Sequence, residues 1–268
     1  MNFKLVLRIT GMTLLLEAAV MVLPMMVALF YGESPLPFLK TILILLVVGL
    51  VLRAIKAKKD FFAREGFCTV GLIWLLMGAF GALPFWFSGL FGPYVDCLFE
   101  TISGFTTTGA TILAQIEGLP LGLLFWRSFT HWLGGMGVLV LTSALLPSLG
   151  ISSAYLVQAE SPGPVVSKLV PKSSQSAKIL YGIYLAMTAL EALLLRIAGM
   201  SWYDAVVHAF ATAGTGGFSV RNLSVGAYAS PAVDIIITVF MLLFSLNFTV
   251  YFLLLCGKWK QALASDEL

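Results

Sequence analysis

Two stretches of the sequence carry threonine and glycine directly after a short apolar segment, and their backbone could bind a cation. The residues concerned are Thr106, Thr107, Thr108 and Gly109 in the first stretch and Ala213, Gly214, Thr215 and Gly216 in the second. Carbonyl groups that face a wet cavity can replace the hydration shell of a small cation. Glycine can take a positive φ without a Cβ clash, which lets successive carbonyls aim at one axis. We therefore interpret each stretch as a short pore helix followed by a selectivity-filter strand.

The composition places these stretches in a membrane protein. Of the 268 residues, 59% are hydrophobic and 11% are charged, whereas soluble domains carry about 25% charged residues. A soluble protein of this size cannot bury so much apolar surface. The net charge of +3 does not suggest a nucleic-acid partner, and Cys68, Cys97 and Cys256 are too scattered for a disulfide framework or a metal site. The expected class is an all-α integral membrane protein that contacts lipid and holds no resident cofactor.

A transmembrane helix needs about 20 mostly apolar residues, and six segments meet that length. They are 7–30, 37–55, 67–91, 124–148, 178–199 and 232–256. Two further apolar segments, 94–105 and 202–213, are too short to cross, so we predict that they enter the membrane and return as pore helices. Non-helical backbone at membrane depth is tolerated only where it is buried in protein or lines a wet cavity. The turns that follow the short segments therefore belong at such a cavity.

The pattern of long helix, short helix, threonine–glycine turn and long helix occurs twice in tandem. The predicted domains are an N-terminal two-helix extension at 1–60, pore unit A at 61–150, a cytoplasmic linker at 151–177 and pore unit B at 178–268. A shift of 107 residues places Thr108 on Thr215, whereas a shift of 108 places Asp96 on Asp204. We therefore expect that one residue was inserted or lost within the short helix.

The positions of the basic residues predict the orientation in the membrane. Lysine and arginine crowd the segment before the first span, the link at 53–64, the link at 149–177 and the segment after the last span. All of these regions fall on one side if six segments cross and the two short ones do not. Because positive charge is retained in the cytoplasm, both termini and the 149–177 link are expected there.

Residues near the two turns are candidates for supporting the filter, namely Glu100, Arg127, His208, Gly217 and Asn247. For Glu100 and His208, at near-equivalent places on the short helices, we favour hydrogen bonds to the backbone behind the filter over a role in concentrating cations. Arg127 is interpreted mainly as a side chain that reaches the outer interface. Asn247 is expected to form hydrogen bonds across helices behind the second filter. The glycines at 134–137 are interpreted as points of close helix packing.

These stretches resemble the TrkH/KtrB family of bacterial potassium-uptake proteins. The matching strings are 99–111, 125–128, 131–137, 159–164, 208–210, 216–219 and 247–249. The resemblance implies a channel-like potassium transport subunit in the bacterial inner membrane, with potassium as the transported ion. It also implies a cytoplasmic nucleotide-binding regulatory subunit of the TrkA/KtrA kind as partner, and a homodimeric assembly.

The sequence departs from this family in the number of its pore units. Family members carry four units in one chain, and this sequence shows two. We therefore expect the chain to need a second copy of itself or a separate C-terminal half before a pore is complete. The alternative is a truncated or structural membrane subunit that does not conduct alone.

Two other kinds of function are less well supported by the residues. Ser103 with His131 or His208 would form an intramembrane serine–histidine dyad. The Gly-x-Ser-x-Gly elbow is missing, because Thr101 stands two residues before Ser103. A metal carrier that used Glu100 and His208 would have too few ligands. An enzyme is therefore not expected.

Overall fold

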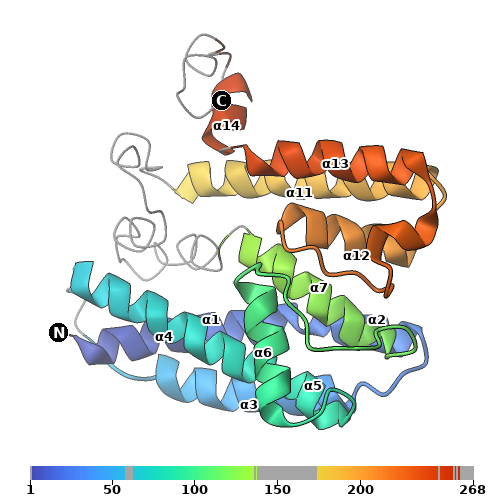
Figure 1. The fold of residues 1–268 in the computed structure, drawn as a ribbon. Coiled ribbons are helices and arrows are strands. Elements are labelled where there is room, and N and C mark those ends of the chain that lie inside the picture. The colour runs from blue at the N-terminus through green and yellow to red at the C-terminus, as the bar shows by residue number, and fades with distance from the viewer. Residues whose placement is uncertain are drawn as a thin grey trace.

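The computed structural model describes residues 2–57, 63–135, 137, 174–246, 248–255, 257 and 259. Within these ranges every regular element is a helix. Figure 1 shows the blue and green N-terminal helices in the lower part of the molecule and the yellow to red C-terminal helices above them. Most of the long helices run in roughly the same direction in this view, as expected for a bundle that crosses a bilayer.

The N-terminal part consists of α1 (Phe3–Val20), α2 (Val22–Phe30) and α3 (Leu36–Arg53). Helices α1 and α3 pack side by side, and two glycines permit their close approach. A Cβ added at Gly11 would meet Leu52 and the Gly49 carbonyl, and one at Gly49 would meet Leu15. Small residues of this kind let membrane helices approach closely.

Proline interrupts two of the long apolar segments without ending them. Pro24 lies in the first turn of α2, and Pro84 lies in the first turn of α5 (Leu83–Ser88), which follows α4 (Ala63–Gly81). Proline has no N–H to donate to the preceding turn, so the helix bends or breaks before it. Each pair still forms one segment long enough to cross a membrane, Phe3–Phe30 and Arg64–Ser88.

Helix α7 (Leu121–Gly135) lies at the centre of the arrangement, since it packs against α2, against α6 (Tyr94–Phe105) and against α12 (Trp202–Ala213). Its N-terminus is capped from the loop between α2 and α3. The backbone N–H groups of Leu121 and Gly122 donate to the Glu33 carboxylate at 2.6 and 2.8 Å. A carboxylate at this end also opposes the positive end of the helix dipole. The cap connects the N-terminal helices to α7.

The C-terminal part consists of α11 (Ser174–Ile197), α12, the 3-10 helix η2 (Ser224–Tyr228), α13 (Pro231–Ser245) and α14 (Phe248–Leu255). Helix α12 begins after Ser201, whose hydroxyl oxygen accepts the Asp204 N–H at 3.0 Å. Serine is among the preferred residues at this N-cap position, because its hydroxyl can accept a free N–H of the first turn. Helix α12 then packs between α11, α13 and α7.

Four of the six predicted spans are confirmed by helix length and composition, as Phe3–Phe30, Leu36–Arg53, Arg64–Ser88 and Ile179–Ile197. The predicted span at 124–148 lies partly outside the described residues, because α7 is described to Gly135 and most of 136–148 is not. The prediction of one continuous helix at 232–256 is wrong. Leu246 has extended backbone (φ −71°, ψ 145°) and separates α13 from α14.

Two hydroxyl groups compensate for the backbone donors that this break removes. The Tyr251 hydroxyl donates to the Leu243 carbonyl at 2.6 Å, and the Ser245 hydroxyl donates to the Leu242 carbonyl at 2.7 Å. Carbonyl groups freed at a helix break need such partners at membrane depth, where water is not available.

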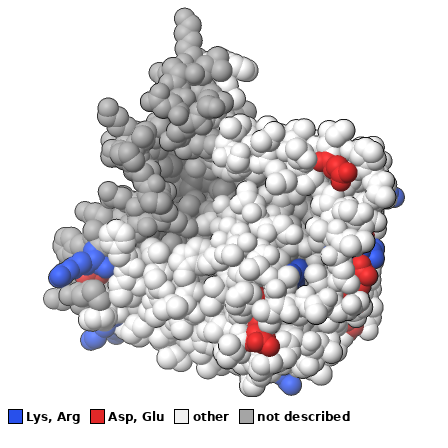
Figure 2. Space-filling view, viewed as in Figure 1, with Lys and Arg blue, Asp and Glu red and all other residues white. Residues whose placement is uncertain are grey.

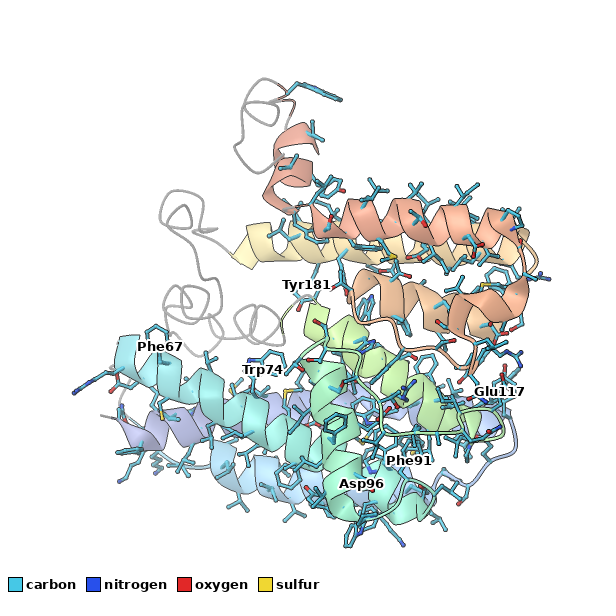
Figure 3. All side chains as sticks on the ribbon, viewed as in Figure 1. Phe67, Trp74, Phe91, Asp96, Glu117 and Tyr181 are labelled. Carbon is cyan, nitrogen blue, oxygen red and sulfur yellow. The ribbon has the colours of Figure 1, made fainter. Side chains whose placement is uncertain are left out.

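The surface also fits a membrane environment. Figure 2 shows that most charged side chains on the visible face lie toward the two ends of the horizontally drawn helices, with an almost uncharged region between them. Large apolar side chains are exposed along the outer helices, such as Val47 and Val51 on α3 and Phe67 on α4. Phe67 projects away from α4 in Figure 3. An apolar surface of this extent is typical of contact with lipid or another protein rather than with water.

Candidate functional site

The two short helices end in the same way, and these ends form the candidate site. In α6, the N–H of Thr107 donates to the Gly104 carbonyl at 3.0 Å and the N–H of Thr108 donates to the Ser103 carbonyl at 2.9 Å. At the end of α12, the N–H groups of Thr215 and Gly216 form the corresponding bonds to the carbonyls of Thr212 and Ala211, at 2.9 and 3.0 Å. Both ends are Schellman motifs, in which one left-handed residue reverses the chain and satisfies free carbonyls.

The structure corrects the predicted register between the two units. Helices α6 and α12 each contain 12 residues, and a single shift of 108 relates their bounds, their terminal hydrogen bonds and their left-handed residues. No residue was therefore inserted or lost within the short helix. The counterpart of 106–109 is 214–217, whereas Ala213, predicted to open the second strand, is the last residue of α12. We call 106–109 and 214–217 the filter strands, after the role that the sequence predicts for them.

Each filter strand contains a threonine in a backbone conformation that suits glycine. Thr107 and Thr215 both have φ of 55°. Positive φ is rare for a β-branched residue, and such strain costs about 1–3 kcal/mol. Gly109 and Gly217 follow two residues later, with φ of 73° and 83°. Because both units place strained threonine and left-handed glycine at matching positions, the strand conformation is a repeated feature rather than a local accident.

The prediction that Gly216 adopts a glycine-only conformation is wrong. The left-handed glycine of the second strand is Gly217, whereas the φ of Gly216 is not positive. Gly216 is instead required by space, because an added Cβ there would collide with the His131 ring. Gly109 combines both requirements, since its φ is positive and its Cβ would collide with the Gly216 carbonyl oxygen. The two filter strands therefore lie in direct backbone contact.

Helix α7 ends between the two strands. A Cβ at Gly134 would collide with the Phe105 carbonyl at the end of α6, and a Cβ at Gly135 would meet Gly214 and the Tyr184 hydroxyl. For Gly134 and Gly135, the interpretation as points of close packing is confirmed. Their small size brings α7 against both short helices at once.

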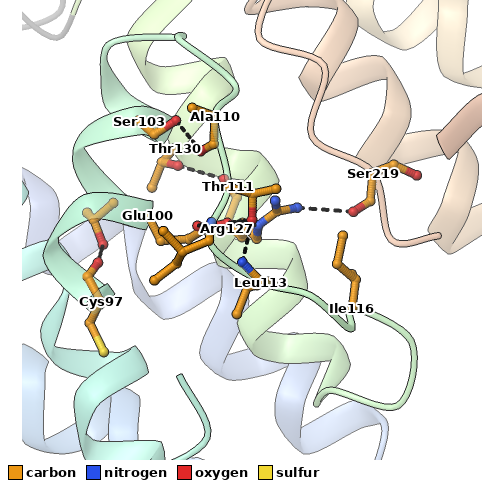
Figure 4. A network of polar contacts seen from close by, with 12 residues as sticks. Cys97, Glu100, Ser103, Ala110, Thr111, Leu113, Ile116, Arg127, Thr130 and Ser219 are labelled. Carbon is orange, nitrogen blue, oxygen red and sulfur yellow. Dashed lines mark hydrogen bonds and ion pairs between the residues drawn. The ribbon is translucent and has the colours of Figure 1, made fainter. Parts of the chain in front are cut away.

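A buried ion pair lies behind the filter strands. The Nε of Arg127 on α7 donates to Oε1 of Glu100 on α6 at 2.6 Å, and both side chains are almost fully buried. Glu100 also accepts from the Thr111 hydroxyl at 2.8 Å and from the Ile112 N–H at 3.2 Å. In the same network, Nη1 of Arg127 donates to the Ser219 carbonyl at 3.0 Å (Figure 4). One ion pair thus connects the segments that follow both filter strands.

The interpretation of Arg127 as a side chain at the outer interface is wrong. Its residual exposure is 2%, and its guanidinium carbon lies 3.5 Å from the centroid of the Phe218 ring. A buried charge is tolerated only when it is paired and hydrogen-bonded, and Glu100, Ser219 and Phe218 provide those contacts. The structural role favoured for Glu100 agrees with this network.

His208 occupies the position in α12 that Glu100 occupies in α6, as the shift of 108 requires. Its Nδ1 lies 2.8 Å from the Asp204 carbonyl and its Nε2 lies 2.9 Å from the Ser219 hydroxyl. A carbonyl can only accept, so Nδ1 carries a proton. The Ser219 oxygen accepts the Arg221 N–H at 3.0 Å, which leaves its own hydrogen for Nε2. The contacts fit a neutral ring that supports the loop after the second strand.

Sequence reasoning did not assign a supporting role to four residues that contact this site: Thr111, Phe218 and Ser219 were given no role, and His131 was considered only for a serine–histidine dyad. Thr111 and Ser219 are related by the shift of 108, and each contacts the supporting side chain of its own short helix. The signal was present in the sequence, as a hydroxyl residue two places after the left-handed glycine of each unit. Asn247 lies outside the described residues.

The described geometry does not form the alternative sites. The Ser103 hydroxyl donates to the Ala110 carbonyl at 2.6 Å, and His208 contacts Asp204 and Ser219 rather than Ser103. No serine–histidine dyad is therefore assembled at Ser103. Within the described ranges, no three His, Cys, Asp or Glu side chains lie together in a way that could hold a metal ion.

The fold and the paired turns define a class of protein, a helical membrane protein in which short helices of two tandem units end against each other. The family model of TrkH, described as a cation transport protein, matches residues 36–266. The chain belongs to this family.

Individual relatives agree with this assignment. The chain is 40% identical over 263 residues to the Trk system potassium uptake protein TrkH of Escherichia coli (strain K12), a match that covers 96% of this chain and 54% of that protein. It is 32% identical over 237 residues to an uncharacterized cation transporter of Methanocaldococcus jannaschii, covering 88% and 49%. The crystal structure of the potassium transporter TrkH from Vibrio parahaemolyticus matches with a TM-score of 0.80 and 36% identity, over 96% of this chain and 53% of that one. The chain thus spans about half the length of the relatives it matches.

Proposed function

We propose that this chain provides two of the filter strands of a potassium transport pore, with backbone carbonyls of 106–109 and 214–217 as ion ligands. The observation that carries the proposal is the matched pair of Schellman turns with threonine at φ of 55°. A strained residue in a repeated motif points to function, because glycine would form the same left-handed turn without the strain. The C-terminal ends of α6 and α12 also carry partial negative charge, which favours a cation.

The exposure of the filter strands supports the need for further strands. Thr106, Thr108 and Thr215 are exposed in this chain although Phe105 and Phe218 beside them are buried. The Thr106 hydroxyl is within hydrogen-bond distance of the Ile102 carbonyl and of the Thr108 hydroxyl, at 2.8 Å each. Non-helical backbone that faced lipid would still leave polar groups unsatisfied, at a cost of several kcal/mol each. An ion stripped of water also needs ligands on all sides. We infer that the exposed side of the strands faces two more units, from a second copy or from a C-terminal half.

The proposal extends to the setting of the protein. The relatives named as parts of a Trk system suggest more than one component, and the partner that we propose is a cytoplasmic nucleotide-binding regulatory subunit. The chain would lie in the bacterial inner membrane as a multi-pass protein, with α6 and α12 as re-entrant pore helices. It would act as a transport subunit rather than an enzyme.

Potassium flux through the purified chain tests the proposal. The mass of the chain in detergent is measured first, and flux into liposomes is then measured for the chain alone and after mixing with a second half from a relative. We expect selective potassium flux only from assemblies with four units. Selective flux from a monomer would contradict the need for further strands, and a lack of flux from every assembly would contradict the transport function itself.

Cysteine labelling tests the proposed orientation. After the native cysteines are replaced, single cysteines at Ser34, Lys56, Ser173 and Ser224 are exposed to an impermeant thiol reagent in intact cells. Ser34 and Ser224 should be labelled from outside because they are exposed on the side where α7 and α13 begin. Lys56 and Ser173, of which Ser173 lies outside the described residues, should react only in opened cells. Labelling of Ser173 in intact cells would overturn the orientation.

A further inference from the structure

His131 is buried against the second filter strand, yet its ring nitrogens form no hydrogen bond with the part of the chain that the structure describes. The side chain is fully buried, and both Nδ1 and Nε2 lack a hydrogen-bond partner among the described residues. Buried polar side chains normally have such partners. Hydrogen bonding therefore does not explain the position of His131, whereas the shape of its ring matches the space beside Gly216.

The ring fills the space in which a side chain at position 216 would lie. The three atoms nearest to a Cβ built on Gly216 all belong to the His131 ring. The φ of Gly216 is not positive, so alanine could adopt the same backbone conformation. The His131 ring thus accounts for glycine at this position, and the flat ring lies directly on the backbone of the second filter strand.

The same ring belongs to a stack that includes the ion pair. His131 lies parallel to Phe218, with ring centroids 3.9 Å apart and an interplanar angle of 21°. Arg127 lies over the same Phe218 ring at 3.5 Å. Two groups this close to one centroid must occupy opposite faces, so Phe218 is held between an imidazole and a guanidinium. Stacking and cation–π contacts favour this order, and Phe218 directly follows the second filter strand.

We propose that His131 is a positioning residue for cation selectivity. Its ring sets the depth of the 214–217 strand by contacting the Gly216 backbone on one side of the strand and fixing Phe218 at its end. A strand without this support could move toward α7 and turn its carbonyls. This inference rests on the proposed function, because the strand must bind cations for its depth to affect selectivity.

A double-mutant cycle between positions 131 and 216 tests the proposal. Gly216→Ala is expected to lower the preference for potassium over sodium by roughly tenfold, since the methyl group and the ring cannot share the space. His131→Ala is expected to lower it as well. The double variant should regain roughly tenfold over Gly216→Ala, because the methyl group enters the space that the ring has left, and contacting residues couple on this scale.

Two variants serve as controls. Gly182→Ala adds a methyl group to a glycine with no neighbour within 4 Å and no positive φ, so its selectivity should equal that of the unmodified chain. His131→Phe keeps a flat ring and should retain selectivity within about threefold, because the ring nitrogens form no hydrogen bonds. Loss of selectivity in His131→Phe equal to that in His131→Ala would overturn a role for ring shape.

The readouts separate this inference from the proposed function. Selectivity is measured from potassium and sodium uptake by the complete transport assembly, and melting of the purified chain in detergent follows the same cycle without transport. Non-additive changes in both measurements support the proposal. Additive changes in both measurements overturn it. Non-additive changes in melting temperature with unchanged selectivity also overturn it, because His131 would then contribute to packing and not to selectivity. If the unmodified assembly transports no potassium, the proposed function fails. The double-mutant cycle measured by melting temperature then still decides whether His131 fixes the position of the 214–217 strand.

Discussion

Gly109→Ser should remove the preference for potassium over sodium in cells that depend on this system. The substitution has two effects, since serine at φ of 73° is strained and its Cβ would collide with the Gly216 carbonyl oxygen. The left-handed conformation alone costs about 1–2 kcal/mol, and the collision must move a carbonyl of the other filter strand. A displaced carbonyl no longer matches the size of one cation, so we expect a loss of selectivity of at least roughly tenfold, or ~1.4 kcal/mol.

Gly118→Ser is the matched control for this prediction. Gly118 also has positive φ, of 92°, but a Cβ there has no neighbour within 4 Å. It should show the conformational cost without the loss of selectivity. Potassium and sodium uptake is measured for both variants at equal expression. Unchanged selectivity in Gly109→Ser would show that 106–109 does not contact the ion.

Arg127→Gln should cause the largest loss of stability among single substitutions at the site. It leaves Glu100 buried without a cation and removes the hydrogen bond to the Ser219 carbonyl. Breaking a buried ion pair from one side costs about 3–5 kcal/mol. Because the pair connects the segments after both filter strands, potassium transport should fall together with stability.

The control is the second ion pair of the described residues, between Arg221 and Asp204 at 3.3 Å. The Arg221 side chain is 45% exposed and that of Asp204 is 9% exposed, so water reaches one partner of this pair and screens it more than the fully buried Glu100–Arg127 pair. Unfolding of Arg127→Gln and Arg221→Gln is compared in detergent with increasing SDS. Equal losses of stability would contradict the central role of the Glu100–Arg127 pair.

Local patterns in the sequence were sufficient to predict the elements that carry the site. The short helices were expected at 94–105 and 202–213, and α6 and α12 have these bounds. Apolar length and the flanking glycine and proline residues determine such helices locally, so one sequence is enough. The break at Leu246 was missed because neither proline nor glycine marks it.

The details of the site depended on contacts between distant residues. The predicted register was wrong because it aligned the two Thr-Gly dipeptides of the sequence. In the structure, the residues with matching backbone conformation are equivalent, so Thr107 is the counterpart of Thr215. A threonine at positive φ is contrary to its intrinsic preference, so no local rule predicts it. Arg127 was misjudged for a similar reason, since its partner Glu100 comes from another helix and only tertiary packing brings them together.

The unlike pair Glu100 and His208 has a consequence for substitution at these positions. The two units share the same backbone conformation at the short helices and turns, but the side chains that support the turns differ. A histidine copied from unit B into position 100 would leave the Arg127 charge buried without an anion, at a cost of about 3–5 kcal/mol. Since Arg127 also contacts Ser219 of unit B, neither unit can change at these positions independently. The two units are thus mutually dependent through one arginine.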